Sequence, residues 1–315
     1  MSWGYVNAIL ILGGINVIAA LGVSILTGYT GLFSIGHAGF MALGGYTSAL
    51  LVLKLNMPFV PALLIGATVA GLSSLLIGYP TFRGQLRGDY FAIATLGFAE
   101  SIRLVLNNAY EIPGFKIGGL EVPPLEIGGA FGLMGIPAKT TTPVILVAVL
   151  LALYFAHMFV TSQHGKNCIA VAQDETAAQM MGVNLLRTKL TALFISAFYA
   201  GIAGGLLAFY MAYLSPSFFN FDRSSGLLAA VVFGGIQSLI GPFITAFVLI
   251  AVPEMLRTFA EWRLIIYGLL FVIVMLFRPQ GLLGYVQMNM NFARRWWASL
   301  TNGGSRAAAS GKGNL

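Results

Sequence analysis

Long apolar runs, separated by short polar stretches, dominate this chain of 315 residues. Runs of roughly 20 apolar residues match the length of helix that crosses the hydrocarbon core of a bilayer. Helices are expected because a helix satisfies its own backbone hydrogen bonds inside lipid. The predicted runs are 5–26, 32–53, 59–79, 90–106, 143–160, 190–213, 227–256 and 264–277. The pattern therefore predicts an all-α fold, a polytopic transmembrane helical bundle embedded in a lipid bilayer.

Basic residues set the predicted orientation. The polar stretch 162–189 contains His164, Lys166, Arg187 and Lys189, whereas 111–139 is richer in glutamate. Because Lys and Arg concentrate in cytoplasmic loops, we predict a cytoplasmic loop at 162–189 and an external loop at 111–141. Counting spans then places the N-terminus outside and the C-terminus in the cytoplasm. We divide the chain into a transmembrane domain, 1–290, and a basic, disordered tail, 291–315.

The run 227–256 is too long for one ordinary span, and the count requires it to leave and return on the same face. It contains glycines and a proline that can break a helix, at 234–242. Two interpretations stay open, a broken or re-entrant element beside a watery pathway and a glycine-mediated helix crossing. The stretch 31–36 is a weak echo of 235–241. With such broken segments included, we expect roughly eight to ten membrane segments. The candidate pathway residues are Ser34, Gly36, His37, Gly235, Gln237, Ser238 and Gly241.

Composition supports a membrane protein. Hydrophobic residues make up 58% of the chain and charged residues 9%, whereas soluble domains carry about 25% charged residues. The net charge of +7 would suggest nucleic acid for a soluble protein, but basic cytoplasmic loops and tails account for it here. We therefore expect no nucleic-acid partner. The single cysteine, Cys168, excludes an internal disulfide and a multi-cysteine metal site.

No catalytic or metal-binding constellation is visible in the sequence. The histidines His37, His157 and His164 are widely separated and lack carboxylates at ligand spacing. The phosphate-loop pattern is absent, since Gly165-Lys166 is followed by Asn167 instead of a hydroxyl residue. We expect no enzyme activity, no metal and no cofactor in this chain.

Two intramembrane features have alternative interpretations. His37 forms either a pathway or packing hydrogen bond, or a bond to a neighbouring backbone carbonyl. Glu100 and Arg103 share a helix face and either neutralise each other or take part in proton coupling.

A short helix is predicted inside the stretch 162–189. Asp174 can cap it, Glu175 lies in its first turn, and Gly182 can end it. Ala177 and Ala178 give it a small, smooth face. Such a helix suits a groove on a cytoplasmic partner, although an ordinary surface helix has a similar sequence.

Several segments together resemble the membrane subunit of the branched-chain amino acid ABC transporter family, over roughly residues 22–284. They are 28–40 (GYTGLFSIGHAGF), 86–98 (LRGDYFAIATLGF), 174–178 (DETAA) with 182–184 (GVN), 238–242 (SLIGP) and 278–282 (RPQGL). The third is similar to the Glu-Ala-Ala…Gly coupling segment of ABC permeases. The resemblance implies that Asp174, Glu175, Ala177, Ala178 and Gly182 couple the chain to an ATPase. Gln237 stands where the family usually has glycine, which leaves the solute open.

The resemblance implies a permease of an ABC importer in a bacterial-type inner membrane, working by alternating access. It implies two cytoplasmic ATPase subunits that use ATP, a second homologous permease subunit and an extracytoplasmic solute-binding protein. The solute is then a branched-chain amino acid or a similar small polar solute such as urea or an amide. The alternative is an ion-coupled secondary transporter or a channel, whose membrane composition is alike.

Overall fold

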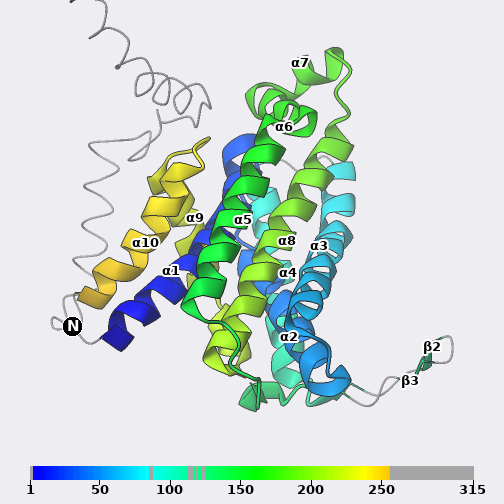
Figure 1. Cartoon of the computed structure of the whole chain (residues 1–315). Coiled ribbons are helices and arrows are strands. Elements are labelled where there is room, and N and C mark those ends of the chain that lie inside the picture. Colours follow the sequence, from blue (N-terminus) through cyan, green and yellow to red (C-terminus); the bar gives the residue numbers. More distant parts are fainter. Residues whose placement is uncertain (1–2, 85–87, 113–115, 118–119, 122–124, 256–315) are drawn as a thin grey trace, which may run out of the picture.

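The computed structural model describes residues 3–84, 88–112, 116–117, 120–121 and 125–255. The helices run side by side as a bundle along one axis (Figure 1). Helices α6 (Gln163–Gln173) and α7 (Glu175–Met180) lie at one end, and the hairpin of β2 (Lys116–Ile117) and β3 (Leu120–Glu121) lies at the other, the end that holds the N-terminus.

Five helices of the described residues are long and apolar enough to cross a membrane. They are α1 (Trp3–Val23) with the π-helical turn η1 (Ser24–Gly28), α2 (His37–Leu55), α3 (Phe59–Arg83), α5 (Thr142–Thr161) and α8 (Leu185–Met211). Between and after them lie α4 (Asp89–Asn108), α9 (Phe221–Gly234) and α10 (Ile240–Met255). The predicted all-α fold is confirmed. The predicted run 264–277 and the tail 291–315 lie outside the described residues, so the total of eight to ten segments stays a prediction.

Two predicted boundaries were wrong. The run expected to begin at Leu32 becomes helical only at His37, and residues 31–36 are irregular, with Gly31 at φ 72°. The third run does not end before Pro80, because α3 continues to Arg83. Pro80 lies in the last turn, where its missing N–H removes only one hydrogen bond, and the N–H of Gly84 donates to the Pro80 carbonyl at 2.9 Å.

Small residues allow the central helices α2, α3 and α8 to pack backbone against backbone. Gly44 meets Gly201, and a Cβ on Gly45 would lie 2.9 Å from the carbonyl oxygen of Gly204. Close approach through small residues is the usual way in which helices associate in lipid. Helix α5 is the opposite case, because only 22% of its span is buried, against 78% for α8. Its apolar side chains therefore face lipid or another subunit.

The external loop predicted at 111–141 contains short strands that the sequence did not indicate. β1 (Glu111–Ile112) pairs with β4 (Leu125–Glu126), and β2 pairs with β3. Beyond the short 3-10 helix η2 (Gly129–Phe131), β5 (Leu133–Met134) pairs with β6 (Tyr213–Leu214) and ties this loop to the end of α8. The two loops that charge assigns to opposite faces do lie at opposite ends of the bundle (Figure 1).

Candidate coupling segment and translocation pathway

The coupling segment, residues 162–189, consists of α6, α7 and the first turn of α8. Asp174 caps α7 as predicted, because its Oδ1 accepts hydrogen bonds from the N–H groups of Thr176 at 2.7 Å and Ala177 at 3.0 Å. Gly182 ends the helix at φ 84°. The preceding helix α6 was not predicted. The residue that could have predicted α6 is Ser162, which caps the helix because its Oγ accepts a hydrogen bond from the N–H of Gly165 at 3.4 Å.

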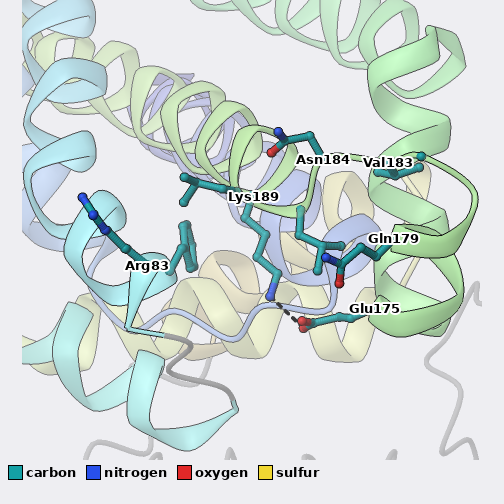
Figure 2. A pocket seen from close by; sticks show the side chains of 10 residues that line it. Arg83, Glu175, Gln179, Val183, Asn184 and Lys189 are labelled. Atoms are coloured by element: carbon teal, nitrogen blue, oxygen red, sulfur yellow. Dashed lines mark hydrogen bonds and ion pairs between the residues drawn. The ribbon is translucent and has the colours of Figure 1, made fainter.

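Lys189 ties three elements of this segment together. Its Nζ lies 2.7 Å from Oε1 of Glu175 in α7 and 5.9 Å from the centre of the Phe82 ring near the end of α3. Figure 2 shows the Lys189 side chain crossing toward Glu175, with Gln179 and Asn184 alongside. These residues line a cavity of about 500 Å³ at the end of the bundle. The Lys189 side chain is only 8% exposed, so the ion pair fixes α7 against the membrane helices.

The outer surface of α7 differs from the predicted smooth alanine face. Ala177 is exposed, but Ala178 is 5% exposed and packs inward, because the two positions lie on different sides of the helix. The exposed end instead carries Met180 and Met181, which are 82% and 85% exposed. Sequence reasoning missed this pair. Adjacent methionines at the end of a polar-loop helix are a usable signal, since flexible thioether side chains adapt to a partner surface.

The two irregular stretches that resemble each other, 31–36 and 235–239, both lie at the end of α1 nearest to α6. The Tyr29 hydroxyl donates to the Gln237 carbonyl at 2.9 Å, and Ser24 Oγ donates to the Ser238 carbonyl at 3.2 Å. A Cβ on Gly31 would contact Ala172 of α6 at 3.5 Å. The predicted pathway break therefore adjoins the coupling segment.

His37 is fully buried where four helices meet. Its Nε2 lies 2.7 Å from Ser196 Oγ, which itself donates to the Gly22 carbonyl at 2.7 Å. Because that hydroxyl proton is used, His37 Nε2–H donates to Ser196. The neighbouring Ala38 N–H donates to Ser224 Oγ of α9 at 2.9 Å. The Nε2 bond is thus a packing bond between side chains that joins α1, α2 and α8, and Ala38 adds α9. A role of His37 in a pathway stays a prediction. Ser34 is also buried and accepts from the Gly36 N–H at 3.3 Å.

The break between α9 and α10 combines the broken helix of one interpretation of the run 227–256 with the glycine contact of the other. The chain leaves helical geometry at Gly235, with φ 115°, and at Gln237, with φ 71°. Ser238 Oγ then accepts from the Gly241 N–H at 3.0 Å and starts α10. At the same point, Gly234 and Gly241 touch backbone to backbone. The helix is therefore broken and its two halves cross at glycine. The role of these residues in a pathway stays a prediction.

The remaining candidates have simple surroundings. Arg103 Nε donates to Glu100 Oε2 at 2.9 Å on a partly exposed face of α4, so the two side chains neutralise each other. Within the part of the chain that the structure describes, no group of three or more His, Cys, Asp or Glu residues could hold a metal ion.

Long apolar spans, a pair of half-length helices and a capped loop at one end define a multi-pass membrane protein. The chain belongs to the family described as branched-chain amino acid transport system, permease component, whose model matches residues 5–276. It is similar to the high-affinity branched-chain amino acid transport system permease protein LivM of Escherichia coli (strain K12), with 36% identity over 85% of this chain and 68% of that protein. It is also similar to LivH of Salmonella typhimurium, with 26% identity over 87% of this chain and 92% of that protein.

No solved structure matches the chain significantly. The relatives are named as permease proteins of high-affinity branched-chain amino acid transport systems. The chain is accordingly a multi-pass inner-membrane permease subunit of an ABC importer.

Proposed function

We propose that this chain forms one half of a pathway that imports branched-chain amino acids, or a closely similar small polar solute, by alternating access. A second homologous permease subunit forms the other half, and an extracytoplasmic solute-binding protein delivers the solute. Two cytoplasmic ATPases bind and hydrolyse ATP, while this chain holds no cofactor. The N-terminus lies outside and the C-terminus in the cytoplasm. The names of the relatives support the solute class, and the basic residues of 162–189 support the orientation.

The observation that carries the proposal is the construction of the coupling segment. Transmission of force between subunits requires a contact that is both exposed and rigidly held. Met180 and Met181 provide an exposed apolar contact at the tip, and the Lys189–Glu175 ion pair holds α7 from behind. Ala172, at the end of α6 next to α7, packs against Gly31, and the nearby Tyr29 bonds Gln237 in the break at 235–239. A displacement of α7 by the ATPase therefore has a short, packed route to the broken helices.

Gly182→Val tests this proposal. Gly182 has φ 84°, and no atom lies within 4 Å of the position of a Cβ, so valine acts through backbone strain alone, at a cost of roughly 1–2 kcal/mol. In proteoliposomes holding the complete transporter, we expect loss of leucine uptake and weaker co-purification of the ATPase. Gly135→Val is the matched control, because Gly135 has φ 79° and equally open surroundings but lies at the opposite end of the bundle. Unimpaired uptake by Gly182→Val would reduce α7 to an ordinary surface helix.

The purified chain alone distinguishes the proposal from its rival. We expect neither ATP hydrolysis nor concentrative uptake without partner subunits. Accumulation of leucine by the chain alone, driven by a proton or sodium gradient, would identify an ion-coupled secondary transporter. Saturable uptake of urea or an amide by the complete transporter, in place of leucine, would overturn the amino-acid assignment while leaving the ABC mechanism intact.

A further inference from the structure

The first turn of helix α9 has an exposed side and a side that is bonded to the middle of the bundle. Ser224, in the first turn of α9, bonds Ala38 in the first turn of α2. The adjoining His37 bonds Ser196, which lies near the middle of α8. The chain reaches this depth through 212–220, where Leu214 and Phe219 are buried and the Tyr46 hydroxyl donates to the Leu214 carbonyl at 3.1 Å. The N-terminal end of α9, which carries a partial positive charge, therefore lies beside these buried contacts, while Phe221 and Asp222 on its other side are exposed.

Arg223 lies in the first turn of α9, and two of the three nitrogens of its guanidinium are unsatisfied in the described part of the chain. Its Nε and Nη2 atoms are buried and have no hydrogen-bond partner within the described residues. A buried, unpaired cation is costly, and an ionisable residue inside a membrane protein marks a functional site by default. Half-helices whose N-termini face the anionic group of a substrate recur in transporters. Among the described residues no acceptor satisfies these two nitrogens, so the arrangement calls for an anion.

A cavity of about 190 Å³ adjoins Arg223 between α1, α9 and α10. Asp222 and Asn16 add a carboxylate and an amide to its polar side. The rest of its wall is apolar or small, formed by Gly226, Leu227, Ala230, Ala246, Leu249 and Ile250. Sites for drug-sized ligands measure roughly 300–1,000 Å³, so this cavity suits a much smaller solute. It combines a cation, an anion and an aliphatic wall.

We propose that this cavity is a solute-binding site for an α-amino acid with an aliphatic side chain. Arg223 binds the carboxylate with its planar fork, Asp222 and Asn16 bind the ammonium group, and the α9–α10 wall receives the side chain. The inference deepens the proposed function and rests on it. It adds a site that the predicted pathway residues do not include, since none of them lines this cavity.

Arg223→Gln tests recognition of the carboxylate. The complete transporter, without its solute-binding protein, is assayed in nanodiscs for binding of radiolabelled L-leucine, with leucinamide and 4-methylpentanoate as competitors. For the unmodified protein we expect L-leucine to compete best, because each analogue lacks one charged group. Arg223→Gln should weaken leucine binding roughly 10- to 100-fold, the worth of a charged hydrogen bond, and should abolish the advantage over leucinamide. Arg223→Lys should retain part of the preference for leucine over leucinamide. The control is the double variant Arg103→Gln with Glu100→Gln, which removes an arginine from α4 together with its partner and should leave leucine binding unchanged.

Gly226→Leu tests the aliphatic wall. No atom lies within 4 Å of a Cβ at Gly226, so leucine enters the cavity without displacing backbone. We expect uptake of leucine and isoleucine to fall at least tenfold while uptake of alanine falls much less. Gly97→Leu is the matched control, because Gly97 on α4 is equally open.

The outcomes separate this site from the wider proposal. If the unmodified transporter imports no amino acid, the proposed function fails. If it imports leucine, and Arg223→Gln and Gly226→Leu both do so at the normal rate with normal competition by leucinamide, the site is wrong and the function stands. Weak binding by Arg223→Gln with leucinamide still competing poorly would show that Arg223 acts only on folding, and would also overturn the site.

Discussion

At the scale of single residues, the reactivity of the Cys168 thiol measures how closely α6 packs against the membrane helices. Its side chain is fully buried, and burial raises the pKa of its thiol. Because the thiolate is the reactive form, a raised pKa lowers the reactive fraction at neutral pH. We expect slow alkylation by a maleimide at pH 7, rising as the pH rises toward that pKa. Met181→Cys, at an exposed position, should react at the rate of a free thiol. Equal rates at the two positions would mean that α6 is not docked against the membrane helices.

Gln237 provides a second test at this scale. It holds φ 71°, a left-handed conformation that costs a side-chain-bearing residue roughly 1–2 kcal/mol. Gln237→Gly should raise the free energy of unfolding by up to about 1 kcal/mol. The gain is smaller than the backbone strain that glycine removes, because glycine also has greater freedom in the unfolded chain. Asn56→Gly, at φ 47°, should gain less, since asparagine tolerates this region. A loss of stability at Gln237 would show that its side chain makes a compensating contact.

At the scale of elements, the coupling segment depends on the bond between α7 and α8. Lys189→Met removes the cation that lies 2.7 Å from Oε1 of Glu175, whose side chain is only 25% exposed, and so breaks the ion pair between α7 and α8. We expect the transporter to hydrolyse ATP at near the normal rate but to move fewer solute molecules per ATP. Combining Lys189→Met with Glu175→Gln should restore part of the number of solute molecules moved per ATP, because the second change removes the negative charge that Lys189 balanced. A double variant that moves no more solute per ATP than Lys189→Met alone would show that this ion pair does not contribute to coupling.

The coupling segment also shows what pattern reasoning could and could not predict. Asp174 and Gly182 have local roles, so the cap and the end of α7 followed from residue types alone. The inward position of Ala178 depends on packing with distant helices, which no local pattern encodes. Arg223 was missed for the same reason. In the sequence it belongs to an ordinary polar connection, and it becomes buried only because 212–220 turns back into the bundle.

At the scale of the whole molecule, the two ends of the bundle should react differently with reagents that cannot cross a membrane. Cysteines introduced at Glu121 and at Met181 lie at opposite ends (Figure 1). In intact cells lacking Cys168, we expect an impermeant maleimide to label position 121 and not 181, and to label both after permeabilisation. The reverse pattern would invert the orientation that the basic residues predict.

The paths of the spans were predictable at this scale because apolar length alone encodes them. The break at 235–239 followed from glycine content and the parity of the count. The meeting of both irregular stretches beside α6 did not follow, because contacts such as Tyr29 with Gln237 join residues far apart in sequence.

The glycine seam between α2, α3 and α8 has a consequence for how this permease tolerates mutation. Even the methyl group of alanine at Gly201 would lie 2.8 Å from the Ala67 Cα atom, and glycines across the seam leave the backbone no room to yield. In a saturation library selected for growth on leucine, we therefore expect no substitution, not even alanine, to survive at Gly44, Gly201 and Gly204. Most substitutions should survive at Gly97. Three helices joined in this way cannot slide past one another. Lipid-facing and loop residues of such a protein can therefore vary freely between relatives, while α2, α3 and α8 keep their packing and move as one rigid body.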